Sequence, residues 1–222
     1  MKKIGIIGAM GSEVELLKSL LKARKETVVA GKTFYEGELG NFKVFLVCSG
    51  IGKVNSAMSA QILIDKFSVD AVINTGIAGG ANGVKVRDVV ISDEVLYHDM
   101  NLRFVAMSYP NLEVFKADKT LIAMAQKACE NENITSVVGR IATGDQFIAD
   151  KEVKADIVKR LSPSAVEMEG GAVAHVCSAN DIPFLVIRSI SDNADDGAEI
   201  DFETFEKLAA DDAARIVADM LS

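Results

Sequence analysis

The chain has 222 residues, of which 49% are hydrophobic and 25% are charged, and its formal net charge is −8. Nucleic acids and anionic membranes are excluded as expected partners because binding to them requires a basic surface, and no apolar run is long enough to span a membrane. The length allows one large domain or two small ones, the apolar content allows a sizeable core, and the charge does not argue against a small, weakly charged ligand.

Apolar runs rich in β-branched residues alternate with helical patterns along the chain. Strands are predicted at 3–8, 42–50, 70–76, 88–95, 136–144, 164–169 and 183–191, and an antiparallel hairpin at 27–39. Helices are predicted at 13–24, 53–66, 118–132, 151–161, 170–180 and 202–221. Several strands are apolar on both faces, as expected of strands buried between two helix layers. The pattern predicts an α/β fold in three layers and one domain, over residues 1–222.

The N-terminal stretch "MKKIGIIGAM" has the charge and apolar run of a signal peptide, but Glu13 and Glu15 follow too early and no small-residue cleavage site appears. The three cysteines, Cys48, Cys129 and Cys177, are far apart and form no CxxC motif. We therefore expect buried, reduced thiols and a cytoplasmic protein.

The first glycine turn, "GIIGAMG", matches no phosphate-binding motif. Its spacing differs from GxGxxG, and the later "SGIGKVNSA" lacks the spacing of a P-loop. The turn carries an anion, Glu13, while Ser12 and Glu15 form an S-x-x-E capping box that predicts Ser12 at the N-cap and Glu13 at the first helical position. The helix dipole would stabilise such a carboxylate by about 0.3–1 kcal/mol, so a structural role for Glu13 stays open. A functional role also stays open, because ligands of α/β sheets bind at strand ends.

A second group of polar residues follows the predicted strand 164–169. Glu167 and Glu169 alternate around Met168, so one of the two acids must point into the crevice of the sheet. Gly170 and Gly171 follow at a predicted helix start, which indicates that some group approaches the backbone closely there.

The last predicted strand contains one charge and ends in acids. Arg188 lies within the apolar run and requires a carboxylate partner if it is buried. Asp192, Asp195 and Asp196 are crowded after the strand, and crowding raises the pKa of neighbouring acids, which suits a proton donor. A solvated turn is the alternative.

No metal site is predicted. A calcium loop is matched only in part, at Asp192, Asp196, Gly197 and Glu203. Ala194 stands where a ligand is needed, and a strand, not a helix, precedes the segment. His98 and His175 are the only histidines, and no cluster has zinc spacing. The residues alone thus predict a strand-end site with Glu13, Glu169 and Asp192, without metal or phosphate, suited to acid/base cleavage of a sugar-like bond.

Six motifs in order over nearly the whole chain resemble those of 5′-methylthioadenosine/S-adenosylhomocysteine nucleosidases. They are "GIIGAMGSEV", "SGIGKVNSA", "INTGIAGG", "GDQFI", "VEMEGGAVAHVC" and "RSISDNAD". The resemblance implies a nucleoside phosphorylase-like fold, which is a three-layer αβα sandwich around a central twisted mixed sheet. It also implies a homodimer without a cofactor, and hydrolysis of the N-glycosidic bond of 5′-modified adenosines to release adenine.

The resemblance further implies roles for individual residues. Glu13 matches the base that activates water, and Asp192, with Ser191 beside it, matches the acid at N7 of adenine. Glu169 matches the carboxylate that binds the ribose hydroxyls, and Met168 packs on the sugar. The remaining implied positions are Phe147 stacked on adenine, Ile148 at the adenine edge through its backbone, Gly79 near the attacked face, and Met10, Ile51 and Phe202 around the ribose and its 5′-thio substituent.

The chain departs from the family pattern in three places. The family commonly has Ala-Thr at Gly170-Gly171, Ser at Ile77, and a longer, different stretch at 98–118 that closes the 5′ pocket, partly from the neighbouring subunit. A phosphorylase, a futalosine-type nucleosidase and a non-catalytic nucleoside-binding regulator remain alternatives from the sequence.

Overall fold

The computed structural model describes residues 1–194 and 198–222, without the side chains of residues 199–201 and 203. Within them ten strands pair into one sheet in the order β10-β6-β8-β9-β5-β1-β4-β3-β2, with β7 beside β6. The strands are β1 (Lys3–Gly8), β2 (Lys22–Val29), β3 (Lys32–Leu39), β4 (Phe42–Cys48), β5 (Ala71–Gly80), β6 (Val89–Tyr97), β7 (Phe115–Lys116), β8 (Ser136–Thr143), β9 (Ala165–Glu167) and β10 (Phe184–Asp192). The helices are α1 (Gly11–Leu20), α2 (Lys53–Phe67), α3 (Leu102–Ala106), α4 (Lys119–Asn131), α5 (Lys151–Leu161), α6 (Gly170–Ala179) and α7 (Ala198–Met220).

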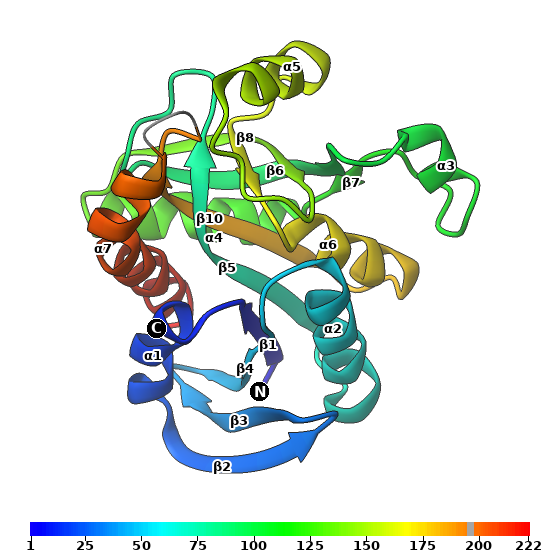
Figure 1. Ribbon diagram of the computed structural model, residues 1–222. Coiled ribbons are helices and arrows are strands. Elements are labelled where there is room, and N and C mark those ends of the chain that lie inside the picture. Colours follow the sequence, from blue (N-terminus) through cyan, green and yellow to red (C-terminus); the bar gives the residue numbers. More distant parts are fainter. Residues whose placement is uncertain (195–197) are drawn as a thin grey trace.

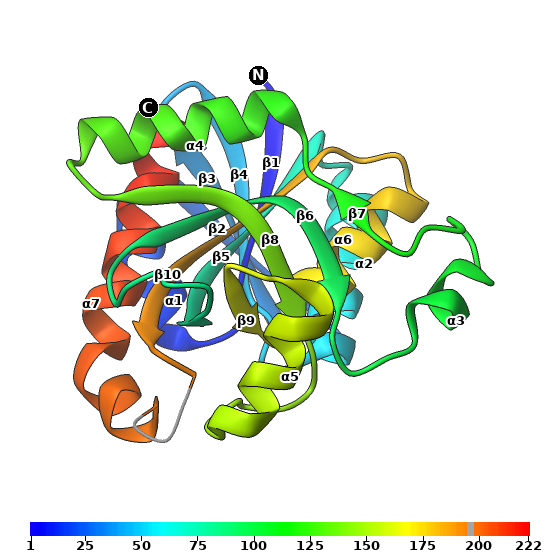
Figure 2. The same cartoon turned by 90° about the horizontal axis from the view of Figure 1, so that it is seen from above.

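Helices cover both faces of the sheet (Figures 1 and 2). α1, α4 and α7 pack together on one face, where α7 contacts β5 and β10, and α2 and α6 pack together on the other. Because both faces are covered, β5 and β10 are buried along their whole length. The predicted three-layer αβα sandwich around a mixed sheet is confirmed.

The central strands set the position of the functional site. β1, β4, β5 and β10 run parallel, while β6 is antiparallel to β10 and β9 is antiparallel to β5. Since β6 also pairs with β8, and β8 with β9, the strands β5, β10, β6, β8 and β9 pair in a closed ring. The short β9 pairs with the last residues of β5 and is antiparallel to it. The residues that follow β9 therefore lie near the carboxyl end of β5.

The first helix begins earlier than the sequence predicted. Its N-cap is Met10, not Ser12, and Glu13 occupies the third helical position. The Ser12 hydroxyl instead donates a hydrogen bond of 2.7 Å to Glu206 on α7. The capping-box prediction was wrong because the Glu13 carboxylate reaches back to the free N–H groups before the helix, which leaves no donor there for Ser12.

The predicted helix 13–24 also ends too late, because α1 stops at Leu20 and residues 22–29 form β2. This strand is the edge of the sheet, and its lysine-rich sequence resembles a helix locally. Antiparallel pairing with β3 overrides that preference and forms the predicted hairpin.

An arm between β6 and β7 carries the short helix α3, and it projects from the body of the molecule (Figure 2). Neither α3 nor β7 was predicted, because both are too short to show a periodic pattern. In the described part of the chain no helix is both long and apolar enough to cross a lipid bilayer.

Candidate active site

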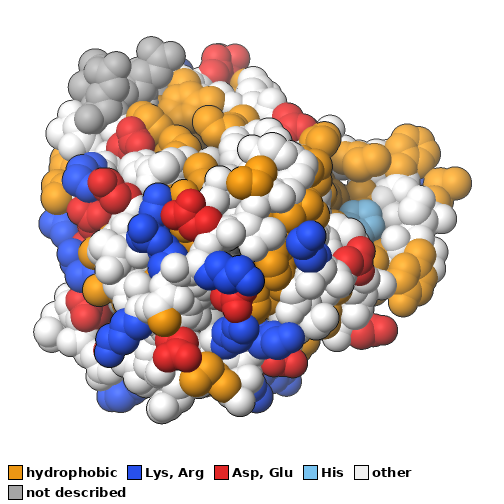
Figure 3. Space-filling model, turned by 90° about the horizontal axis from the view of Figure 1, so that it is seen from below, with side chains coloured by type: hydrophobic (Ala, Val, Ile, Leu, Met, Phe, Trp, Pro, Cys, Tyr) orange, Lys and Arg blue, Asp and Glu red, His pale blue; other side chains and the backbone are white. Residues whose placement is uncertain are grey.

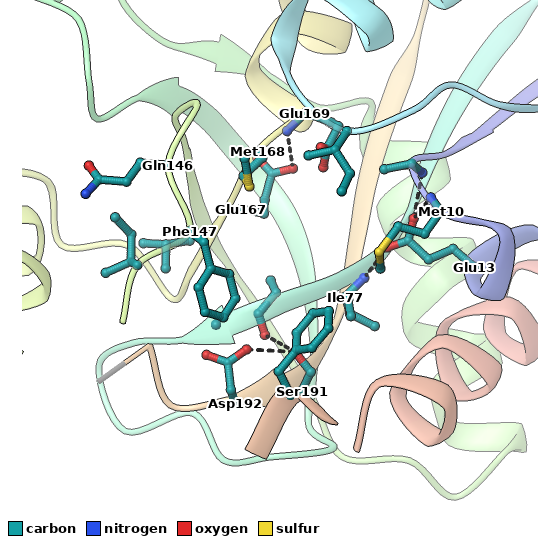
Figure 4. A pocket seen from close by; sticks show the side chains of 17 residues that line it. Met10, Glu13, Ile77, Gln146, Phe147, Glu167, Met168, Glu169, Ser191 and Asp192 are labelled. Atoms are coloured by element: carbon teal, nitrogen blue, oxygen red, sulfur yellow. Dashed lines mark hydrogen bonds between the residues drawn. The ribbon is translucent and has the colours of Figure 1, made fainter. Parts of the chain in front are cut away.

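A cavity of about 270 Å³ lies at the carboxyl ends of β1, β5 and β10 (Figure 4). The turn between β9 and α6, the loop between β8 and α5, and the start of α7 complete its walls. It contains every residue that the sequence predicted for the site: Met10, Glu13, Ile51, Gly79, Phe147, Ile148, Met168, Glu169, Ser191, Asp192 and Phe202.

Glu13 is 4% exposed and points into the cavity from the first turn of α1. Its Oε2 accepts hydrogen bonds from the backbone N of Ala9 (2.6 Å) and Met10 (2.9 Å), and its Oε1 accepts one from the backbone N of Ile77 (3.0 Å). Burial raises the pKa of Glu13, although the positive charge of Arg188 and these donors act in the opposite direction. The carboxylate is therefore fixed in position and holds its proton more tightly than an exposed glutamate.

Gly76 makes room for this carboxylate. A β-carbon at Gly76 would lie 2.3 Å from Oε1 of Glu13, and one at Gly8 would lie 3.1 Å from its β-carbon. Gly8 at the end of β1 and Gly76 within β5 thus permit a buried acid to lie close to the backbone. In a phosphate-binding turn the backbone N–H groups would instead be free to bind the anion.

Glu167 is the partner that Arg188 requires. The Arg188 guanidinium, 1% exposed, donates to Oε2 of Glu167 and to Oδ1 of Asn74 (2.7 Å). Glu167 also accepts from the Thr143 hydroxyl and from the backbone N of Gly170 (2.7 Å). The prediction that Arg188 pairs with a carboxylate is confirmed. Both carboxylate oxygens of Glu167 accept hydrogen bonds from other groups of the protein.

Glu169 is less completely paired and remains available to the cavity. Its Oε1 accepts a hydrogen bond of 2.8 Å from the backbone N of Gly52, and its Oε2 lies 3.6 Å from Arg188. Burial, together with the charge of Glu167, raises the pKa of Glu169 to about 8. Three carboxyl groups, those of Glu13, Glu167 and Glu169, thus act on one guanidinium, an excess of negative charge that favours retention of a proton among them.

Asp192 lies across the cavity from Glu13, at the end of β10 (Figure 4). It is 2% exposed; its Oδ2 accepts from the Ser191 hydroxyl (2.8 Å) and its Oδ1 from the backbone N of Ala194 (2.7 Å). Gly79 lies against it, since a β-carbon there would be 3.0 Å from Oδ1. The predicted crowding by Asp195 and Asp196 lies outside the described residues.

Most of the remaining wall residues are apolar. Phe147 and Phe202 meet edge to face with ring centroids 5.6 Å apart, and Phe202 packs with Met10 and Ile77. Among the described residues no group of three or more His, Cys, Asp or Glu side chains could hold a metal ion. Of the partial calcium loop, Asp196 and Gly197 and the side chain of Glu203 lie outside the described residues.

The model of the phosphorylase superfamily matches residues 3–222. A 5′-methylthioadenosine/S-adenosylhomocysteine nucleosidase from an Exiguobacterium species is 43% identical to the chain over 222 residues, which cover 97% of this chain and 95% of that one. The chain belongs to this nucleosidase family within the phosphorylase superfamily. The resemblance inferred from six motifs is confirmed.

Solved structures that are similar to the chain include members of the nucleosidase family. The enzyme of that name from Neisseria meningitidis, in complex with methylthio-immucillin-A, is 39% identical with a TM-score of 0.94 and covers 99% of this chain and 98% of its own. A futalosine hydrolase mutant of Helicobacter pylori is 32% identical with a TM-score of 0.92, over 99% and 98% of the two chains.

Some residues that line the cavity were not predicted from the sequence. The cavity also contains Ala9, Ile77, Ala78, Gln146, Val166 and Glu167. Most are neighbours of predicted residues and carry small or apolar side chains, which give no signal in a sequence. Glu167 carried a signal, the alternation with Glu169, but the pattern could not say which acid would be paired.

The departure from the family pattern at Gly170-Gly171 has a structural reason. A β-carbon at Gly171 would lie 2.9 Å from both Thr143 and Tyr97, and one at Gly170 would lie 3.0 Å from Val186. The groups that approach the Gly170-Gly171 backbone closely are therefore side chains of the protein itself.

The raised pKa of Glu169 predicts a pH dependence of stability. Because the folded protein keeps this proton up to about pH 8 while the unfolded chain loses it near the ordinary glutamate value, the free energy of unfolding should fall as pH rises between the two. Glu169→Gln keeps an acceptor for Gly52 and removes the titration. We expect the melting temperature of the variant, relative to the wild type, to increase from pH 5 to pH 8, measured by circular dichroism. A constant difference would contradict the raised pKa.

Proposed function

We propose that the protein hydrolyses the N-glycosidic bond of 5′-methylthioadenosine and S-adenosylhomocysteine and releases adenine. The observation that carries the proposal is the meeting of Glu13, Glu169 and Asp192 in one largely apolar cavity. Relatives over the full length are nucleosidases of this name, and the solved structure of the Colwellia psychrerythraea enzyme contains adenine itself. The substrates are thus small nucleosides, and the reaction requires no cofactor.

Asp192 acts on the leaving group, adenine. Cleavage of the bond from C1′ to N9 transfers its electron pair to adenine, and Asp192 donates a proton to N7 to neutralise that charge. The hydrogen bonds from Ser191 and from the backbone of Ala194 fix the carboxyl group in place. Phe147 stacks on the base, and the backbone of the buried Ile148 binds its edge.

Glu13 and Glu169 act at the ribose. Water attacks C1′ while Glu13 accepts its proton, and each proton transfer is worth about 10²–10⁴-fold in rate. Glu169 binds the ribose hydroxyls, with Met168 against the sugar. Burial disfavours the anionic form of Glu169, and the positive charge that develops on the ribose favours it.

The site favours water over phosphate. The backbone N–H groups of Ala9, Met10 and Ile77 already bind the Glu13 carboxylate, and the Arg188 guanidinium binds Glu167. A phosphate would lack these donors and would face an anion. These contacts disfavour the phosphorylase alternative that the sequence left open.

Purified protein tests the proposal directly. We expect it to release adenine from methylthioadenosine at a rate independent of added phosphate, with no ribose 1-phosphate product detected by chromatography. Turnover that depends on phosphate would favour the phosphorylase alternative. The futalosine hydrolase neighbour makes futalosine a necessary third substrate; turnover of it alone would replace the proposed substrates within the same chemistry. Binding without turnover of any substrate would favour the non-catalytic regulator.

We also propose that two copies of the chain associate through the face beside the cavity. Exposed apolar side chains gather on the arm between β6 and β7, which is the projecting orange group on the right of Figure 3. They are Met100, Phe104, Met107, Tyr109 and Leu112. An ion pair between Lys53 and Asp99 joins the base of the arm to α2, where Ile51 and Val54 are also exposed. Because Ile51 lines the cavity, a partner on this face would complete its open side.

Light scattering after size exclusion tests the homodimer. We expect a mass of two chains, and a shift to one chain in Phe104→Asp, because a charge on this apolar face opposes burial. A monomer at micromolar concentration would contradict the proposal. Cytoplasmic location stays a prediction from the sequence.

A further inference from the structure

The N-terminus of α2 is held by acids from two other segments. The backbone N of Gly52 donates to Oε1 of Glu169 (2.8 Å), and the backbone N of Lys53 donates to Oδ1 of Asp145 (2.9 Å). α2 has no side-chain cap of its own and no acidic residue in its first turn. Gly52 and Lys53 therefore connect the Glu169 carboxylate, which lines the cavity, to the segment that contains Asp145.

Asp145 is held at a second point. Its backbone N donates to Oδ2 of Asp99 (2.9 Å), and the ammonium of Lys53 lies 2.7 Å from the same oxygen and 3.6 Å from Oδ2 of Asp145. Partial burial acts to raise the pKa of Asp99, but hydrogen bonds from Lys53 and Asp145 lower it below its usual range. The three side chains therefore form a charged set in which Lys53 balances two acids.

The approach of Asp145 to α2 is close. Gly52 has a φ of +96°, and a β-carbon there would lie 3.1 Å from Oδ1 of Asp145. A glycine meets both requirements, the left-handed backbone and the narrow gap.

Asp145 immediately precedes residues that line the cavity. β8 ends at Thr143, and Gln146, Phe147 and Ile148 then form one wall. Since Phe147 is partly exposed and meets only the Phe202 ring as an aromatic neighbour among the described residues, its position depends on the backbone of this loop. The bond from Asp145 to Lys53 attaches the start of the loop to the same helix end that binds Glu169.

We propose that Asp145 is a positioning residue that attaches the loop 144–150 to the N-terminus of α2, and so sets Phe147 and Ile148 relative to Glu169. The inference rests on the proposed function, because there Phe147 and Ile148 contact adenine while Glu169 contacts ribose. Asp145 itself touches no substrate. It acts by ordering the loop before the ligand binds, which removes an entropic cost from binding.

The test compares adenine binding by Asp145→Ala with that by the wild type, using calorimetry. Loss of one partly exposed charged hydrogen bond predicts about five- to tenfold weaker binding and a similar rise in KM, with kcat changed by less than about twofold. Asp145→Asn keeps an acceptor for the Lys53 backbone and should recover most of the affinity. Lys53→Met keeps the backbone donor and should weaken binding by less than Asp145→Ala.

Asp118→Ala is the matched control, because the Asp118 carboxylate likewise binds backbone N–H groups at a helix start, those of Thr120 and Leu121 on α4, and Asp118 lies outside the loop. It should lower the melting temperature and leave adenine binding unchanged. Should Asp145→Ala fail to fold, Asp145→Ser replaces it with the same expectation. Wild-type affinity in either variant, or an effect limited to the melting temperature, would overturn the positioning role. Wild-type protein that neither binds nor releases adenine would instead reject the proposed function.

Discussion

Asp192→Asn is expected to leave a folded protein that releases adenine at least about a hundredfold more slowly than the wild type. The asparagine keeps the size of the side chain and can still donate a hydrogen bond to N7, but it cannot transfer a proton. Adenine would then leave as an anion, and the barrier of the chemical step would rise. The loss should therefore appear in kcat, with a smaller change in KM.

Stopped-time chromatography of adenine, with circular dichroism as the check on folding, measures this effect. Asp181→Asn is the control, since Asp181 is an exposed turn residue and the substitution removes the same charge. An Asp192→Asn enzyme with wild-type kcat would show that the leaving group is protonated from elsewhere, and the role assigned to Asp192 would be withdrawn.

Glu13→Gln is expected to lower the rate by at least about a hundredfold as well, but for a different reason. The amide cannot accept the proton of the attacking water. It also presents an NH₂ group where the carboxylate accepts three backbone N–H groups, so part of that support is lost. The melting temperature must therefore be measured beside the rate to separate chemistry from stability.

The pH profile gives a second readout for Glu13. Because burial raises its pKa and the base must be ionised, kcat/KM of the wild type should increase with pH through a limb that lies above the ordinary glutamate pKa. The residual activity of Glu13→Gln should lack this limb. Glu15→Gln is the matched control, since Glu15 lies on the same helix and is exposed. An unchanged limb in Glu13→Gln would assign the titration to another group.

Much of the site could be predicted because it follows a rule of sheets. Polar residues and glycines that directly follow apolar strands converge where parallel strands end, so Glu13 and Asp192 could be grouped although 178 residues lie between them along the chain. Arg188 could be assigned an acidic partner because a buried charge in an apolar strand cannot remain unpaired.

The same local reasoning was wrong where distant contacts compete with it. Ser12 has the sequence of an N-cap, but a buried acid one residue later binds the free N–H groups and Ser12 turns to α7. Residues 22–24 were predicted to continue the first helix, but antiparallel pairing with β3 makes them the start of the edge strand β2. In both places the winning interaction joins groups that no local window contains.

The sequence by itself determined the layered α/β architecture and the list of residues at the strand ends, because hydrophobic periodicity and strand-end chemistry are local properties. Only the tertiary structure decided how the acids divide their tasks. Glu167 pairs with Arg188, Glu169 stays available to the cavity, and Asp145 attaches a loop to α2, since pairing depends on distances between segments that the chain order does not fix.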